Sequence, residues 1–175
     1  MLFRSNLFSV DAARVVAEAR GVFGEDAEAL IDTYERNRPG AKGSDLLVAF
    51  MTDHIFRIPV IRVAETQAEQ GRDAFMYWFT YESQVVDFLK ACHALELPFV
   101  FGTLDAGAML TGSGDDRQPL SDAMVEAWVR FARTGDPGWP AYDPATRPVM
   151  RFGATDTGLV HDPDAEERLL WEGRA

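Results

Sequence analysis

Residues 74–81 limit the possible folds of this chain more than any other segment. They read Ala-Phe-Met-Tyr-Trp-Phe-Thr-Tyr, so both alternating faces of an extended segment are apolar or aromatic. This pattern is typical of a strand in the middle of a sheet that helices cover on both sides. We therefore expect an α/β protein in which residues 74–81 form a buried strand.

Helices are predicted on both sides of this strand. Apolar residues at helical spacing indicate buried helix faces, formed by Ala12, Val15, Val16 and Ala19; by Ala27, Leu30, Ile31 and Tyr34; by Leu46, Ala49 and Phe50; by Val60, Val63 and Ala64; and by Met124, Ala127, Trp128 and Phe131. Asp11 is expected at the N-terminus of the first helix, and Ser44 is expected to cap the third. Pro59 is expected to interrupt the helical pattern. Residues 149–152 and 158–161 fit a terminal hairpin.

Length, charge and cysteine content limit the class of protein to which this chain can belong. The 175 residues, 47% hydrophobic and 26% charged, suffice for one globular domain with a substantial core. The net charge of −11 argues against nucleic acid and anionic membrane surfaces as partners. No apolar run is long enough to span a bilayer, and the segment Met1–Phe8 lacks the long apolar stretch of a signal peptide. Cys92 is the single cysteine, so no internal disulfide is possible, and we expect a cytoplasmic protein.

Two titratable side chains interrupt an apolar run after the strand. His93 and Glu96 stand in residues 91–102, which read Ala-Cys-His-Ala-Leu-Glu-Leu-Pro-Phe-Val-Phe-Gly. Such groups are costly to bury unless they are paired, so we interpret the run as a loop, and loops of this kind often carry function. The preceding residues 84–92 fit a helix and an apolar loop equally well. Taken alone, a single His in an apolar loop is more often structural than catalytic.

Together with its neighbours, this run resembles the C-terminal part of type-B carboxylesterases, the cholinesterase-like branch of the α/β-hydrolases. The run matches the family pattern H-x-x-E-[LI]-x-F-V-F-G, and Asp53, Arg57, Pro59 and Arg62 match the family helix D-x-x-F-R-x-P-x-x-R-x-A. Further matches are Gln118–Ser121, Trp128–Pro137, Trp139–Asp143 and Arg147–Phe152. A single H-x-x-E motif is weak evidence for a family. The ordered series of matches is strong evidence, because it covers nearly the whole chain.

The resemblance implies a function and a place for the chain in the fold. It implies a single partial domain over residues 1–175, the C-terminal portion of an α/β-hydrolase fold with helices around a partial, mostly parallel sheet. It implies a carboxylic ester hydrolase that acts on small-molecule esters, with His93 as the catalytic base and without a cofactor. Glu96 is expected to accept hydrogen bonds that hold the loop, and Phe99 and Phe101 are expected to anchor the loop in the core.

The other parts of a serine esterase are missing from the sequence. The chain contains no G-x-S-x-G segment and no Gly-Gly pair for an oxyanion loop. Gly112-Ser113-Gly114 is too short and follows His93, whereas the fold places the serine before the histidine. The resemblance implies that the acidic residue of the catalytic triad lies immediately before Met1. We therefore expect the isolated chain to be inactive, its sheet to be incomplete, and its partners to be a separate N-terminal half or further copies of itself.

Other interpretations of these residues remain open. The chain is alternatively a non-catalytic remnant or an interaction module of the same fold. His93 and Glu96 lack a second ligand pair of suitable spacing, so no metal site is expected. Cys92 is a sequence neighbour of His93 and does not form a dyad with it. Arg57 and Arg62 are interpreted as structural cations that bind carboxylates, and His54 and His161 as surface or capping residues.

Overall fold

The computed structural model describes residues 10–174, and the chain divides into two compact units. The first unit comprises the residues up to Val63 together with the segment from Asp164 onward, and the second comprises Ala64–Pro163. The expectation for Met1–Phe8 lies outside the described residues. Among those described, no helix is both long and apolar enough to cross a membrane.

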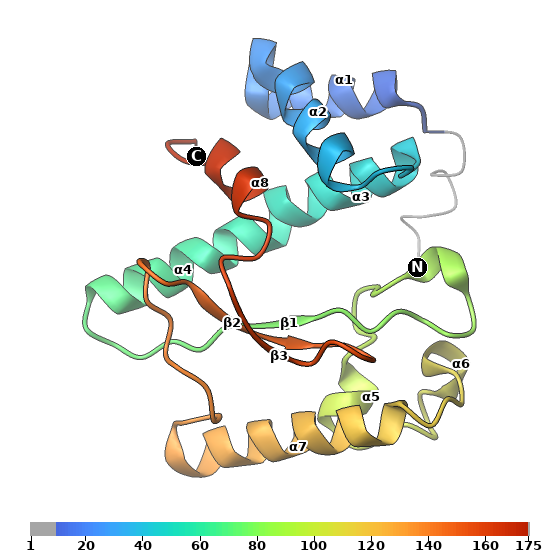
Figure 1. Cartoon of the computed structure of the whole chain (residues 1–175), viewed down its shortest axis with the longest axis vertical. Helices are drawn as coiled ribbons and strands as arrows, with labels where there is room; N and C mark the ends of the chain where they lie inside the picture. Colours follow the sequence, from blue (N-terminus) through green and yellow to red (C-terminus); the bar gives the residue numbers. More distant parts are fainter. Residues whose placement is uncertain (1–9, 175) are drawn as a thin grey trace. The chain divides into compact units, whose positions relative to one another are not determined.

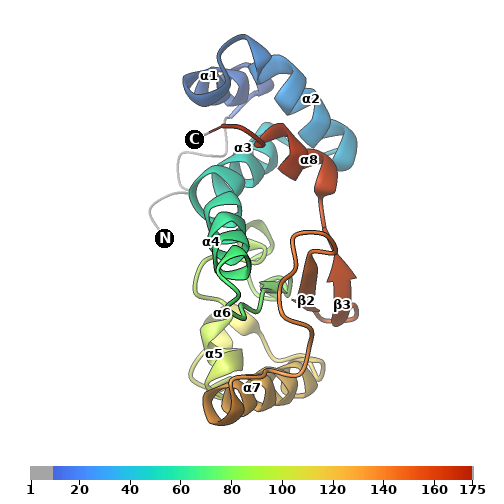
Figure 2. The same cartoon turned by 90° about the vertical axis from the view of Figure 1, so that its left-hand side faces the viewer.

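The first unit is built from helices, which gather together in both views (Figures 1 and 2). They are α1 (Ala12–Phe23), the 3-10 helix η2 (Gly24–Asp26), α2 (Ala27–Asn37), α3 (Gly43–Thr52), the π-helix η3 (Asp53–Arg57), the start of α4 (Ile58–Glu69), and α8 (Ala165–Leu170). The predictions for the first two helices are confirmed. The Asp11 carboxylate accepts a hydrogen bond of 2.9 Å from the backbone N–H of Arg14 and caps α1.

The predicted buried faces of α1 and α2 pack into the core of this unit. Val15 and Ala19 are fully buried on α1, and the four apolar residues predicted for α2 are all buried. The side chain of Ala12 lies outside the description. Helix α8, which the sequence did not predict, contributes to the same core through Trp171, whose ring centroid lies 4.8 Å from that of Phe23.

The predicted start of α3 and the predicted break at Pro59 are wrong. Helix α3 begins at Gly43, because the Asp45 carboxylate accepts a hydrogen bond of 3.1 Å from the backbone N–H of Lys42 one turn earlier. Pro59 lies inside a continuous helical run, since a π turn widens the backbone just before it. The wider turn relieves the clash between a proline ring and the carbonyl four residues earlier.

The π turn also rotates the buried face of α4. Val60 and Val63 were expected to be buried, but they are 52% and 61% exposed. Ala64 is buried as predicted, and Ile58 and Ile61 are buried in place of the two valines. A π turn adds a residue to the helical repeat, which turns the following face by roughly 100° relative to an uninterrupted α-helix.

A buried polar network holds the first unit together around Asp53. The Asp53 carboxylate accepts a hydrogen bond of 2.5 Å from the Tyr34 hydroxyl and two from the Arg57 guanidinium, at 2.6 and 2.9 Å. The Tyr34 hydroxyl accepts in turn from the indole of Trp171 at 3.2 Å. Burial, and then the charge of Asp53, raises the pKa of Tyr34. Arg57 is thus the structural cation that the sequence indicated, one turn after its carboxylate on the same helical run.

Two further arginines fasten α8 to the other helices. The Arg38 guanidinium donates to both oxygens of the fully buried Glu167 carboxylate. The Arg62 guanidinium donates to the backbone carbonyls of Trp171 and Arg174. Arg62 therefore has a structural role, as predicted, and binds backbone carbonyls.

The second unit contains a three-stranded mixed sheet. Its strands are β1 (Tyr77–Phe79), β2 (Pro148–Phe152) and β3 (Gly158–His161), in the order β1-β2-β3. Strand β1 runs parallel to β2, with Tyr77 opposite Met150, and β2 pairs antiparallel with β3. The predicted terminal hairpin is therefore confirmed, and it accounts for the antiparallel half of the sheet. The partial α/β fold is confirmed, but the described sheet is mixed rather than mostly parallel, because the terminal hairpin pairs β3 antiparallel to β2.

Strand β1 is shorter and less buried than the sequence predicts. Hydrogen bonds from Met150 N to Met76 O, at 3.0 Å, and from Thr80 N to Phe152 O, at 2.8 Å, extend the pairing at both ends. All three strand residues are only half-buried, and among the described strands β1 lies at an edge. A strand whose two faces are apolar needs cover on both faces, which the described part of this chain supplies incompletely.

Helices cover one face of this sheet. They are α5 (Leu97–Val100) and α7 (Arg117–Thr134), which lie side by side in both views (Figures 1 and 2). The 3-10 helix η4 (Asp87–Leu89) and α6 (Ala108–Thr111) belong to the segments that connect β1, α5 and α7. Residues 84–92 are thus mostly loop. Helix α7 ends at Gly135, whose φ of +76° permits a left-handed C-cap. Met124 and Ala127 are buried as predicted, whereas Trp128 and Phe131 are 43% and 44% exposed.

Replacing Asp53 with alanine is expected to destabilise the chain by about 3–5 kcal/mol, because it leaves the buried Arg57 guanidinium without its counter-charge. The side chains of Asp53 and Arg57 are only 5% and 12% exposed. Urea unfolding of the purified chain measures the loss. Glu28→Ala is the matched control, since its ion pair with Arg20 is exposed and its loss costs about 1 kcal/mol or less. Equal losses for the two variants would contradict the role assigned to the network.

Candidate active site

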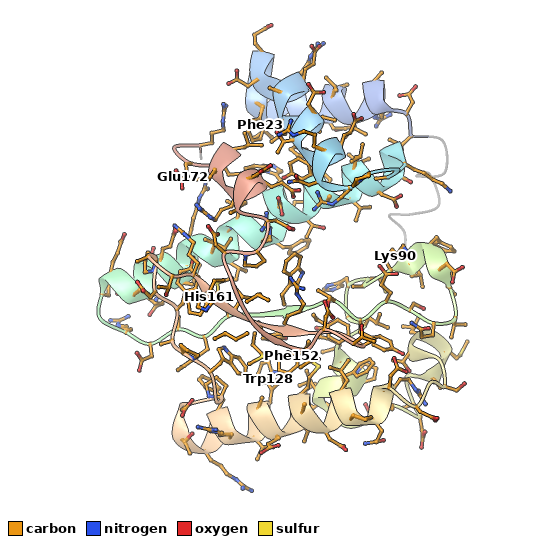
Figure 3. The ribbon with its side chains drawn as sticks, in the orientation of Figure 1. Phe23, Lys90, Trp128, Phe152, His161 and Glu172 are labelled. Atoms are coloured by element: carbon orange, nitrogen blue, oxygen red, sulfur yellow. The ribbon has the colours of Figure 1, made fainter. Side chains whose placement is uncertain are left out.

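His93 lies on a turn near the carboxyl end of β1. After β1, residues 83–90 form a closed loop, since the backbone N–H of Ser83 donates to the carbonyl of Lys90 at 3.1 Å. The Ser83 hydroxyl donates to the carbonyl of Leu110 at 2.7 Å and ties this loop to α6. The closed loop returns the chain to Ser83, four residues after the end of β1, and the turn His93–Glu96 follows soon afterwards. Figure 3 labels Lys90, which marks this end of the loop.

The turn geometry exposes His93 and buries its neighbour. The backbone N–H of Leu95 donates to the carbonyl of Cys92 at 3.1 Å, which closes a tight turn with His93 and Ala94 as its central residues. Ala94 adopts a φ of +67°, the left-handed backbone that such a turn requires at this position. The side chain of Leu95 is then fully buried, while His93 is exposed. An apolar anchor beside the histidine therefore holds the turn against the protein.

Phe99 anchors the segment after the turn. Its ring is fully buried, with centroids 4.9 Å from Tyr81 and 5.3 Å from Phe79. The buried Ser121 hydroxyl on α7 donates to the carbonyl of Phe99 at 2.9 Å. One aromatic ring and one backbone hydrogen bond thus connect α5 to both the sheet and α7.

The expectation that Phe101 also anchors the loop is wrong. Its side chain is 70% exposed. Residues two apart on a helical turn point about 200° apart, so Phe99 and Phe101 face opposite sides of the short helix α5. The alternation that suggested two anchors is a strand pattern, whereas residues 97–100 are helical.

The expected hydrogen bonds to the Glu96 side chain are not found among the described residues. Glu96 and Tyr77 line the same groove. Burial, followed by the charge of Glu96, raises the pKa of the Tyr77 phenol. The backbone carbonyl of Glu96 accepts from the N–H groups of Phe99 and Val100, at 3.0 and 2.9 Å. Glu96 therefore joins the turn to α5 through its main chain.

An apolar groove adjoins this turn. The groove, which we name the α5–α7 groove, has a volume of about 400 Å³. Its lining residues come from β1, the turn, α5 and α7: Tyr77, Glu96, Leu97, Val100, Phe101, Trp128, Val129 and Ala132. Trp128 is labelled in Figure 3, and its ring packs edge-on against Tyr77 with centroids 6.1 Å apart.

The core beneath the turn contains buried polar residues that the sequence analysis did not single out. Tyr81, Ser83 and Ser121 are buried, and each donates to a carbonyl in another segment. The Tyr81 hydroxyl donates to Thr111 O at 3.1 Å. A polar side chain within an apolar strand or helix face was the signal available in the sequence, because such a group is buried only with a partner.

The other candidate residues have structural surroundings. The ring of His54 packs nearly parallel to the rings of Phe50 and Trp171 in the first unit, with centroids 6.0 and 5.5 Å away. The His161 ring is hydrogen-bonded through Nδ1 to the carbonyl of Thr146 at 2.9 Å. Cys92 is half-buried and packs against the core of the second unit. Within the described residues, no cluster of three or more His, Cys, Asp or Glu side chains is arranged to hold a metal ion.

The chain is similar to known proteins in sequence and in fold. The carboxylesterase family model matches residues 10–171. The para-nitrobenzyl esterase of Bacillus subtilis is 35% identical over 152 residues, which cover 81% of this chain and 29% of that esterase. Carboxylesterase 1C of the mouse is 30% identical over 155 residues, covering 82% of this chain and 27% of that protein. A solved carboxylesterase of Geobacillus stearothermophilus matches with a TM-score of 0.79 and 34% identity, over 95% of this chain and 36% of that one.

Helices against a mixed sheet, with a histidine turn near the end of a parallel strand, place the chain among partial α/β-hydrolase folds. The chain belongs to the carboxylesterase family. The resemblance to type-B carboxylesterases that the motifs indicated is thereby confirmed. The chain spans between 27% and 36% of the length of these relatives.

Replacing Phe99 with alanine is expected to destabilise the chain by about 3–5 kcal/mol, because it leaves a cavity among Tyr81, Phe79 and α7. Phe101→Ala is the matched control and is expected to change the stability by less than about 0.5 kcal/mol, since the side chain is exposed. Urea unfolding of both variants beside the unmodified chain provides the comparison. A larger loss for Phe101→Ala than for Phe99→Ala would restore Phe101 as the anchor.

Proposed function

We propose that this chain is the C-terminal portion of a carboxylic ester hydrolase, in which His93 is the general base and acid. The observation that carries the proposal is the exposed His93 on an anchored turn at the carboxyl end of β1, in a chain of the carboxylesterase family. In open α/β sheets, reacting groups gather at the carboxyl ends of parallel strands. The H-x-x-E-L-x-F-V-F-G match supports His93 over the other two histidines.

The chemistry proposed for His93 is acyl transfer to water. The imidazole takes the proton of a serine hydroxyl as the serine oxygen attacks the ester carbonyl, and it then gives that proton to the leaving alcohol. It next takes a proton from water, which hydrolyses the acyl-serine, and returns that proton to the serine oxygen. An acid that orients the imidazole and N–H donors for the oxyanion complete the machinery. These groups would come from the N-terminal portion.

We assign Glu96 a supporting role in the same site. Its backbone carbonyl, which accepts two hydrogen bonds from α5, keeps the turn in register with the helix. Its side chain would lie at the edge of the site, in the groove that Tyr77 also lines. The proposed substrates are small-molecule esters, the class named for the para-nitrobenzyl esterase of Bacillus subtilis.

The proposal includes the rest of the domain. Residues 1–175 would form one partial α/β-hydrolase domain that an N-terminal half completes, either in one polypeptide or as a separate chain. Self-association of this chain through its uncovered apolar residues is the alternative assembly. We also propose a cytoplasmic location, which accords with the single cysteine.

A second candidate function is a non-catalytic interaction module of the same fold. It is favoured by the lack of a G-x-S-x-G segment in the sequence. An open reading frame that continues upstream of the Met1 codon and encodes G-x-S-x-G followed by D-E-G would decide for the hydrolase.

The purified chain alone is expected not to hydrolyse p-nitrophenyl acetate or p-nitrophenyl butyrate above its His93→Ala variant. Without the serine and the oxyanion donors, the covalent route is closed. Release of p-nitrophenol measures the rate. Turnover by the chain well above that of the variant would show that it carries a nucleophile of its own.

Co-expression with the N-terminal portion of the Bacillus subtilis para-nitrobenzyl esterase, ending where its match to this chain begins, is expected to restore ester hydrolysis. His93→Ala should lower the rate of the purified complex at least about a thousandfold, because the serine then lacks its base. His161→Ala and His54→Ala are the controls and should retain the activity of the complex. Loss of activity with His54→Ala and not with His93→Ala would show that the base is wrongly assigned.

A further inference from the structure

Two residues on either side of His93 have a backbone conformation that is unusual for a residue with a side chain. Lys90 has a φ of +50° and a ψ of −148°, and Ala94 has a φ of +67°. Residues other than glycine keep such conformations only where neighbouring contacts hold them, and they gather at functional sites. The segment that carries His93 is therefore held, at both ends, in a conformation that its own backbone disfavours.

The carbonyl of Lys90 holds the first of these two positions. It accepts hydrogen bonds from the backbone N–H groups of Ser83, at 3.1 Å, and Cys92, at 2.9 Å. One carbonyl thus joins the start of the 83–90 loop to the residue immediately before His93. The Lys90 ammonium lies 2.9 Å from the Glu82 carboxylate, but both side chains are more than half exposed, so this ion pair adds little to the hold.

Ser83 fixes the other side of this backbone junction. Its side chain is buried, and its hydroxyl donates to the carbonyl of Leu110 on α6 at 2.7 Å. The next residue, Gln84, packs so closely against Gly112 at the end of α6 that a Cβ on the glycine would lie 2.7 Å from the Gln84 Cβ. Ser83 therefore connects α6 to the carbonyl that holds Cys92.

We propose that Ser83 and Lys90 are positioning residues for His93, and that they act on it through the backbone N–H of Cys92. The Ser83 hydroxyl itself takes no part in the reaction, because it is buried and donates its proton to a carbonyl. A base that leaves its reactive position for part of the time slows proton transfer without weakening substrate binding. The effect on catalysis rests on the proposed function, whereas the effect on the place of the His93 ring does not.

The test uses purified complexes of this chain with the N-terminal portion of the Bacillus subtilis para-nitrobenzyl esterase and follows hydrolysis of p-nitrophenyl acetate. Ser83→Ala removes the hydroxyl and is expected to lower kcat about tenfold while KM stays within about twofold. Thr33→Val is the matched control, since the buried Thr33 hydroxyl also donates to a carbonyl, that of Ala29 in the first unit, at 3.1 Å. It should retain kcat within about twofold.

A pair of substitutions at Lys90 separates the backbone conformation from the ion pair. Lys90→Val and Lys90→Gly both remove the ammonium group, but only glycine adopts this backbone conformation readily. Lys90 is exposed in a loop, so both variants should fold, which urea unfolding of each chain checks. Lys90→Val is expected to lower kcat about tenfold, and Lys90→Gly to restore it to within about twofold of the unmodified complex. Equal kcat values for the two variants overturn the proposal.

Proton NMR of the chain alone gives a readout that does not depend on activity. The sequence contains three histidines, so the ring signals of His54, His93 and His161 are assigned with the corresponding alanine variants. The two variants expected to lower kcat should shift or broaden the His93 signal, and the other two should leave it in place. A His93 signal that is the same in all four variants overturns the proposal.

The two readouts distinguish this proposal from the proposed function. If the complex is inactive, or keeps its activity with His93→Ala, while the His93 signal responds to Ser83→Ala and Lys90→Val, the place of the ring is set as proposed and the assignment of His93 as the base is overturned. If activity depends on His93 but Ser83→Ala and Lys90→Val leave kcat unchanged, the base is correctly assigned and the positioning role is overturned.

Discussion

The burial of Phe99 is the packing interaction on which the candidate site depends. Its ring fills the space between Tyr81 and Phe79, and its carbonyl accepts from Ser121 on α7. With Leu95, it fixes both ends of a short segment whose backbone would otherwise be free to move. The exposed histidine therefore stands on a rigid support. A catalytic base needs such a support, because proton transfer requires a defined distance and direction to its partner.

The first unit depends on a different requirement: its buried charged side chains must have hydrogen-bond partners. Asp53, 4% exposed, sits where a π turn displaces the helical repeat, and it receives hydrogen bonds from Tyr34 and Arg57. A buried carboxylate without such donors is strongly destabilising. The family motif that contains Asp53 and Arg57 therefore encodes a structural junction, where the helix changes its register.

The chain combines an ordered turn around His93 with an apolar groove that its described residues leave uncovered. Its relatives are about three times as long, and the residues of the α5–α7 groove and the half-buried β1 are apolar where solvent would favour polar groups. Under the proposed function, the N-terminal portion completes both the sheet and the triad.

The sequence by itself determined the family, the helices with clear periodicity and the position of His93 in a motif, because each depends on local spacing or on an ordered series of short matches. It also identified Arg57 as structural. Only the tertiary structure decided the orientation of α4, since a single π turn redirects every later side chain, and only it separated Phe99 from Phe101. Helix α8 and the Ser121 contact were likewise out of reach of periodicity, because their partners lie far away in the sequence. Local pattern predicts which residues are apolar, whereas long-range packing decides which of them are buried.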